Sequence, residues 1–234
     1  AHEQVESSRR SGEMGFFELP YDSDGSGRSQ ELADRLEGRF ENLVIIGIGG
    51  SALGARTLRD ALLGSLWNER SNEERAGRPR MYILDNVDPG AVLDVIEHLD
   101  LRRTLFNVVS KSGSTAETMA LYLVIEGLLI EEVGTERAGE HFVFTTDPEN
   151  GPLRSIAEAE GIESLPIPRN VGGRFSVLSP VGLFPAALAG VDAAGLLAGA
   201  ARADEYCRTP MLQENLAGLM ATLLYTAHKE SGAS

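Results

Sequence analysis

Short apolar runs recur along the chain and predict the strands of a buried sheet. The runs cover residues 43–48, 81–84, 105–109, 142–146 and 164–167. Their β-branched and aromatic side chains are typical of strands that are covered on both faces. Because helical patterns alternate with these runs, we expect an α/β fold: a five-stranded, mainly parallel sheet with helices on both faces.

Helical patterns are predicted between the strands and at the C-terminal end, at residues 30–40, 50–63, 91–98, 119–125, 153–160, 179–188, 193–202 and 211–228. Residues 1–30 are polar and rich in Gly, Ser and Asp, apart from one apolar island at 16–20. We expect this island to anchor the N-terminal arm on the main body. We therefore divide the chain into an arm and helix at 1–40 and a ligand-binding domain at 41–234.

A hydroxyl-rich stretch, residues 110–118, joins the end of the third predicted strand to the following helix. Backbone N–H groups and the positive end of the helix dipole converge at such a turn, which suits an anion. Side-chain donors come from Ser110, Ser112, Ser114 and Thr115. Gly113 lets the backbone approach a ligand closely. A plain helix cap before Glu117 is the alternative, but four hydroxyls and a glycine exceed what capping needs, so the stretch predicts a phosphate-binding loop.

A glycine-rich turn, residues 49–54, follows the first predicted strand and is a second candidate phosphate-binding turn. Gly47, Gly49 and Ala52 also fit the dinucleotide pattern G-x-G-x-x-A, with Asp85 as a candidate ribose-binding acid. In the flavodoxin-like strand order 2-1-3-4-5 the turns after strands one and three share a crevice, whereas in the Rossmann order they lie apart. Two turns that could each bind an anion favour the flavodoxin-like order and a compact phosphorylated ligand. A nucleotide-dependent oxidoreductase is kept as an alternative.

The third motif is an arginine that follows two glycines, in residues 170–176. One interpretation of Arg174 is an ordinary exposed loop arginine. Gly172 and Gly173 favour a second interpretation, in which the backbone is shaped to aim the guanidinium at a ligand.

Composition narrows the class of ligand. The 234 residues are 42% apolar, and the net charge of −14 argues against nucleic acid and requires a phosphate site to be locally positive. Cys207 is the single cysteine and the four histidines are scattered, so we predict no disulfide within the chain and no metal. No bilayer-spanning stretch or signal-peptide pattern is evident, and we expect a cytoplasmic protein with no membrane partner.

With these motifs in place, the chain resembles the glucose-6-phosphate isomerase family, bacterial type, over nearly its whole length. The resemblance rests on residues 15–21, 47–54, 110–118 and 172–183. It implies the first of two sugar-isomerase (SIS) domains, with a flavodoxin-like fold. The implied activity is the interconversion of glucose 6-phosphate and fructose 6-phosphate through a cis-enediol, in glycolysis and gluconeogenesis, with no cofactor and with a homodimer as the complete enzyme.

The resemblance also implies roles for individual residues. The implied substrate-binding residues are Gly50, Ser51, Ser110, Lys111, Ser112, Thr115 and Gly173. The hydroxyls would hold the phosphate, with main-chain help around Lys111, and Gly50 and Ser51 would line the sugar side. Arg174 would be catalytic, because a fixed cation stabilises the oxyanion character of the enediol more in the transition state than in the ground state.

The family's base, a glutamate, and its ring-opening histidine and lysine lie beyond the last matched motif. Glu230 superficially resembles the base but follows that motif too soon, and His228 is interpreted as a helix-end residue. We therefore expect this chain to supply the phosphate-binding half, without the second SIS domain, and to be inactive alone. A non-catalytic sugar-phosphate-binding regulatory SIS module is the second hypothesis, and the oxidoreductase is the third.

Overall fold

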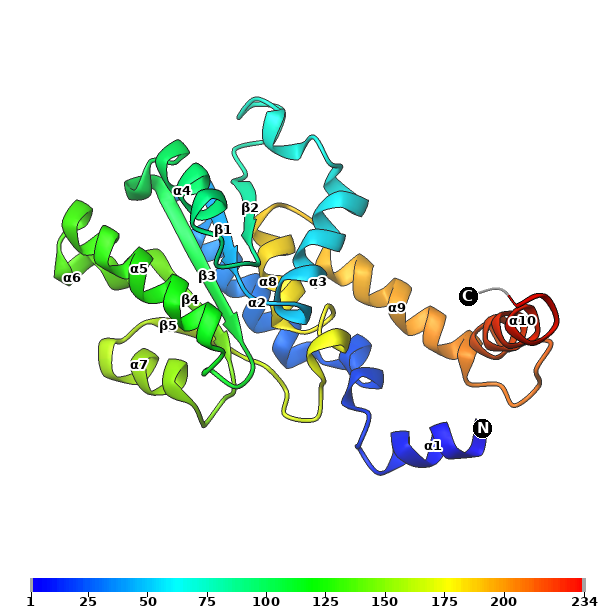
Figure 1. The fold of residues 1–234 in the computed structure, drawn as a ribbon. Coiled ribbons are helices and arrows are strands. Elements are labelled where there is room, and N and C mark those ends of the chain that lie inside the picture. Colours follow the sequence, from blue (N-terminus) through cyan, green and yellow to red (C-terminus); the bar gives the residue numbers. More distant parts are fainter. Residues whose placement is uncertain (1, 233–234) are drawn as a thin grey trace.

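The computed structural model describes residues 2–232, and a five-stranded parallel sheet forms its centre (Figure 1). The strands are β1 (Asn42–Ile46), β2 (Arg80–Leu84), β3 (Thr104–Ser110), β4 (Phe142–Thr146) and β5 (Glu163–Pro166). Their order is β2-β1-β3-β4-β5, and every neighbouring pair is parallel. This confirms the predicted flavodoxin-like order, in which β1 and β3 are neighbours.

Helices cover both faces of the sheet, as predicted. The longer ones are α1 (His2–Arg10), α2 (Ser23–Leu36), α3 (Gly50–Leu58), α4 (Pro89–His98), α5 (Ala116–Val133), α7 (Pro152–Glu160), α8 (Pro180–Leu188), α9 (Ala193–Cys207) and α10 (Leu216–Ser231). A short helix, α6 (Thr135–Ala138), follows α5.

Each face of the sheet has its own apolar core. Side chains along β1 alternate between the two faces, so Leu43 and Ile45 pack with α2, α3 and α8, whereas Val44 and Ile46 pack with α4, α5 and α7. All five residues of β1 are buried, which explains why this strand reads as a continuous apolar run.

The N-terminal region differs from the prediction. The sequence indicated a polar arm and a helix from residue 30, but α2 already begins at Ser23 and α1 precedes it. Asp22 caps α2 by accepting a hydrogen bond from the Gly25 N–H at 3.0 Å. Gly25 and Ser29 are buried in a helix that packs against α8. The small Gly and Ser residues that suggested a loop instead allow α2 to pack closely against α8.

The other helices agree with the prediction except at their ends. The helix predicted at 50–63 ends as α3 at Leu58 and continues as a π-helical turn, Arg59–Leu63. The last predicted helix begins at Leu216, later than expected, because Asn215 caps it by accepting from the Gly218 N–H at 2.8 Å.

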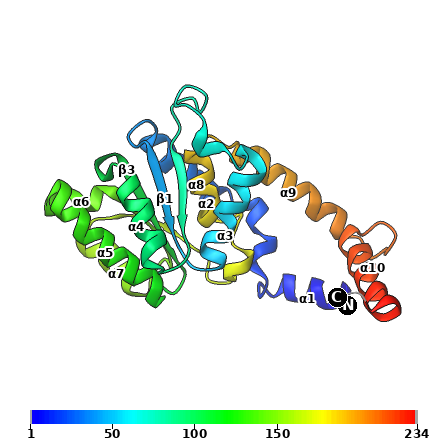
Figure 2. The same ribbon diagram turned by 45° about the horizontal axis from the view of Figure 1, so that its top comes forward.

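The C-terminal helices α9 and α10 project away from the sheet (Figures 1 and 2). Large apolar side chains of α10 are exposed, namely Leu216, Met220, Leu223, Leu224 and Tyr225. No helix within residues 2–232 combines the length and the apolar character that crossing a membrane would need. The division of the chain at residue 40 stays a prediction.

Candidate functional site

The phosphate-binding loop predicted at 110–118 lies between β3 and α5. The hydroxyl of Ser110 lies 3.0 Å from the Thr115 hydroxyl and 3.5 Å from that of Ser112, and Ser110 is almost completely buried. Thr115 is the N-cap residue of α5, but its side chain makes no capping hydrogen bond. The missing side-chain cap argues against the plain-cap alternative. The hydroxyls of Ser110, Ser112 and Thr115 instead face one another at the start of α5.

The backbone of this loop is supported from β4 and from the start of α7. Thr146 donates a hydrogen bond to the Ser110 carbonyl at 2.7 Å. Gly151 has a φ of +100°, and a Cβ on it would lie 2.4 Å from the Ser112 carbonyl oxygen. Gly151 was not among the predicted site residues, although its position just before Pro152 at a helix start was a usable signal.

The glycine-rich turn after β1 lies beside this loop, because β1 and β3 pair in parallel. Gly49 adopts φ +57° and ψ −118°, a conformation suited to glycine, and is the N-cap of α3 without a side-chain cap. A Cβ on Gly47 would lie 2.8 Å from the Ser51 Cβ. Two uncapped helix N-termini, those of α3 and α5, thus lie at the carboxyl edge of neighbouring strands.

The structure brings the third motif to the other two. A Cβ on Gly50 would lie 2.3 Å from the carbonyl carbon of Gly173 and 2.8 Å from the amide nitrogen of Arg174, so α3 begins against that backbone. The ammonium of Lys111 donates to the carbonyls of Arg169 at 2.6 Å and Val171 at 2.8 Å. The Lys111 side chain thus ties the phosphate-binding loop to the segment that carries the arginine.

We call residues 169–176 the arginine loop. Within it, the Phe175 N–H donates to the Gly172 carbonyl at 2.9 Å and the Ser176 hydroxyl donates to the Gly173 carbonyl at 2.7 Å. The Arg174 side chain is exposed, and its guanidinium has no hydrogen-bond or ion-pair partner among residues 2–232. It is therefore available to an anionic ligand.

The start of the arginine loop is also fixed to the segment that follows β4. Arg169 forms ion pairs with Asp147 at 3.5 Å and Glu149 at 2.7 Å. Hydrogen bonds from the N–H groups of Glu149 and Asn150, together with Arg169, lower the pKa of Asp147. Asp147 is thus a charged anchor at neutral pH.

Other candidate residues lie elsewhere or are engaged. Asp85, the candidate ribose-binding acid, is paired with Arg56 at 2.7 Å, and the strand order is not the Rossmann order. Glu230 and His228 belong to α10, which lies far from the sheet in both views (Figures 1 and 2). Within residues 2–232 no cluster of three or more His, Cys, Asp or Glu side chains could hold a metal ion.

The chain is similar to known proteins in sequence and in fold. Residues 28–231 match the family described as phosphoglucose isomerase. Glucose-6-phosphate isomerase of Carboxydothermus hydrogenoformans is 44% identical over 216 residues, which cover 92% of this chain and 46% of that protein. An enzyme of the same name from Thermus thermophilus is 44% identical over 214 residues, 91% of this chain and 48% of that protein.

Two solved structures show the same fold. A hypothetical protein from Thermus thermophilus has a TM-score of 0.86 and 42% identity, covering 97% of this chain and 52% of its own. A glucose-6-phosphate isomerase from Chlamydia trachomatis has a TM-score of 0.74 and 30% identity, covering 88% of this chain and 37% of its own. The chain spans about half the length of the curated relatives it matches.

Proposed function

The chain belongs to the phosphoglucose isomerase family, and on that premise we propose that it supplies the phosphate-binding half of an enzyme that interconverts glucose 6-phosphate and fructose 6-phosphate. The observation that carries the proposal is the convergence of three motifs, in which Gly50 and Lys111 both contact the arginine loop. A regulatory module that only binds sugar phosphates has less support, because binding alone does not require an arginine aimed at the reacting carbons.

The substrate's phosphate is bound by Ser110, Ser112 and Thr115, together with main-chain N–H groups around Lys111. Hydroxyl and N–H donors at the starts of α3 and α5 make the site locally positive, as a phosphate requires in a chain of net charge −14. Gly50, Ser51 and Gly173 line the sugar side. A Cβ on Gly173 would meet no atom within 4 Å, which leaves room for the sugar at that position.

Arg174 stabilises the cis-enediol. Moving a proton between C1 and C2 places negative charge on an oxygen, and a guanidinium fixed beside that oxygen stabilises the transition state more than the ground state. The general base and the ring-opening group come from outside this half. Glu230 does not serve as the base, because proton transfer needs hydrogen-bond reach to the substrate carbon and α10 projects away from the sheet.

The full-length gene product acts in the cytoplasm as a homodimer. The family resemblance supports both statements. The exposed apolar side chains of α10 further support association, because an apolar surface of this kind is normally covered by another protein surface. Size-exclusion chromatography with light scattering on the full-length gene product measures the oligomeric state.

A coupled assay of fructose 6-phosphate conversion tests the isomerase proposal. The full-length gene product should turn over, and the double substitution Ser110→Ala with Thr115→Ala should mainly raise KM. Each lost charge-assisted hydrogen bond is expected to cost about 1.5–3 kcal/mol of substrate binding. The matched control is Ser26→Ala with Thr57→Ala, because these helix hydroxyls donate only to backbone carbonyls within the preceding turn.

Two outcomes would contradict the proposal. The first is a KM that the Ser110 and Thr115 substitutions leave unchanged. This result would mean that the substrate's phosphate does not bind to this loop. The second is turnover by residues 1–234 alone that Glu230→Gln abolishes, which would place the base on α10.

A further inference from the structure

The arginine loop is flanked by contacts from a distant part of the chain, residues 12–21, which we call the N-terminal arm. Two 3₁₀ turns form most of this arm, Gly15–Phe17 and Leu19–Tyr21. The arm contacts the loop on both sides of Arg174, through Asn170 before it and Phe175 directly after it.

The contact after Arg174 is aromatic. The rings of Phe16 and Phe175 are stacked, with centroids 4.9 Å apart and an interplanar angle of 18°. Phe17 packs against Phe16 at 4.2 Å, so the stack extends into the arm. Phe175 is still 52% exposed with this stack in place. The ring of Phe16 thus covers one part of a largely exposed side chain.

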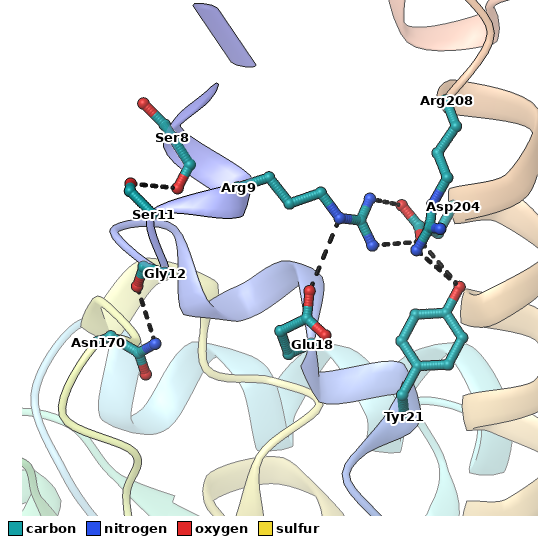
Figure 3. Close-up of polar contacts among 9 residues, drawn as sticks. All are labelled: Ser8, Arg9, Ser11, Gly12, Glu18, Tyr21, Asn170, Asp204 and Arg208. Carbon is teal, nitrogen blue, oxygen red and sulfur yellow. Dashed lines mark hydrogen bonds and ion pairs between the residues drawn. The ribbon is translucent and has the colours of Figure 1, made fainter. Parts of the chain in front are cut away.

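The contact before Arg174 is an exchange of hydrogen bonds. The Gly15 N–H donates to the Asn170 carbonyl at 3.1 Å. In return, the Asn170 side-chain amide donates to the Gly12 carbonyl at 2.9 Å, as Figure 3 shows. A Cβ on Gly15 would lie 2.3 Å from the Asn170 side chain. A side chain at position 15 would therefore displace the Asn170 amide from its contact with the arm.

The arm is fixed to α9 by its own Tyr21 and by Arg9 of α1, which directly precedes the arm. The guanidinium of Arg9 donates two hydrogen bonds to Asp204, at 2.6 and 2.7 Å, and Tyr21 donates a third at 2.8 Å (Figure 3). The side chains of Arg9 and Asp204 are only 9% and 8% exposed. Arg9 also lies over the Phe17 ring, 4.8 Å from its centroid. These contacts join α9 to the aromatic stack that ends at Phe175.

We propose that the N-terminal arm is the positioning element for Arg174, and that Phe16 and Asn170 are positioning residues for the reaction. This inference rests on the proposed function of Arg174. Gly172 and Gly173 leave the backbone before the arginine free to adopt many conformations, and an unpaired guanidinium adds its own rotamers. An oxyanion donor is effective only when it is preorganised where the charge develops. The arm restricts the arginine loop on both sides of Arg174 and so preorganises the guanidinium.

The test separates positioning from general stability through kcat and KM of the full-length gene product. Phe16→Ala should lower kcat about ten- to a hundredfold, the range seen when reacting groups are misplaced by about 1 Å, with KM within about twofold. Phe16→Tyr keeps the aromatic face and should restore kcat. Leu93→Ala, a 52% exposed apolar side chain on α4, is the control and should leave both constants unchanged. Asn170→Ala is the second variant if Phe16→Ala does not fold.

A double substitution gives a readout that a purely structural role would not produce. If the arm acts through the guanidinium, Phe16→Ala should have no further effect on kcat in an Arg174→Ala background. If the kcat losses of Phe16→Ala and Arg174→Ala multiply in the double variant, the proposal is wrong. It is also wrong if Phe16→Ala and Asn170→Ala each leave kcat unchanged.

Limited trypsin digestion distinguishes failure of this inference from failure of the proposed function. Loosening of the loop should speed cleavage after Arg174 by about tenfold in Phe16→Ala and not in Leu93→Ala, since cleavage follows the population of open conformations. If Arg174→Ala does not affect turnover, the proposed role of Arg174 fails whatever the arm does. If Arg174→Ala abolishes turnover but Phe16→Ala changes neither cleavage nor kcat, only the role of the arm is wrong.

Discussion

The phosphate-binding loop and the arginine loop meet at Lys111 but are built in different ways. The first is closed by hydrogen bonds among its own residues, such as the one between the Ser110 and Thr115 hydroxyls. Its outside support comes from one neighbouring segment, through Thr146 and Gly151. The second is held from a distance by the side chain of Lys111, the ring of Phe16 and the close approach of Gly50. On the proposed function, phosphate binding thus depends mainly on one short stretch of the chain, whereas the orientation of Arg174 depends on contacts from several distant segments.

This difference predicts how each loop responds to substitution. Changes within the phosphate-binding loop should act on binding and stay local. The arginine loop should respond to changes far away in sequence, because each distant contact removes some of its conformational freedom. Three substitutions test the contrast, from the arginine itself outward.

The largest effect is expected for Arg174→Ala in the full-length gene product. Removal of one preorganised oxyanion donor typically lowers kcat about 10²–10³-fold, and substrate binding should weaken far less, because the charge develops only in the transition state. Steady-state kinetics with fructose 6-phosphate measures both constants.

Arg174→Lys is the companion variant. It keeps the charge but loses the planar fork, so it should recover only part of kcat. An effect confined to KM would make Arg174 a ligand of the phosphate or of a sugar hydroxyl, and the two loops would then share one function.

Much of the fold followed from the sequence because its signals are local. The strands are apolar runs, and the Ser110–Thr115 loop carries its donors within a few residues. The start of α2 at Ser23 did not follow. Buried Gly25 and Ser29 look like loop residues until α8 packs against them. The role of the Lys111 side chain was also hidden, because its acceptors are carbonyls about sixty residues away.

A smaller effect is expected for Gly50→Ala, which inserts a methyl group between the start of α3 and the arginine loop. The new Cβ would lie 2.3 Å from backbone atoms of Gly173, so the two segments must move apart. Overpacking of this kind costs about 1–3 kcal/mol of stability, and kcat should fall because Arg174 moves with Gly173.

Gly127→Ala is the matched control for that methyl group. Gly127 lies within α5, and a Cβ there meets no atom within 4 Å. The substitution should leave kcat unchanged and raise the free energy of unfolding slightly, because Ala has the higher helix propensity. Equal behaviour of the two variants in urea unfolding and in kinetics would mean that the contact at Gly50 does not position the loop.

The smallest effect on turnover is expected where the arm meets α9, from Asp204→Ala. This substitution leaves the largely buried Arg9 with only its longer ion pair to Glu18 at 3.7 Å, and it should lower the free energy of unfolding by about 1–3 kcal/mol. The hydrogen bonds from Arg9, with those from Tyr21 and Arg208, hold the pKa of Asp204 well below its usual range. Its contribution is therefore fully present above the unfolded pKa of about 3.9 and is lost as the pH falls through the lower folded pKa. Urea unfolding should show a constant difference in unfolding free energy between wild type and Asp204→Ala from about pH 5 to 8, and a shrinking one below about pH 4.

The control is Asp24→Ala, which breaks an exposed pair with Arg28 and should cost no more than about 0.5 kcal/mol. A cost at Asp204 no larger than at Asp24 would show that α9 does not anchor the arm, and the order of the arginine loop would then come from Lys111 and Gly50 alone.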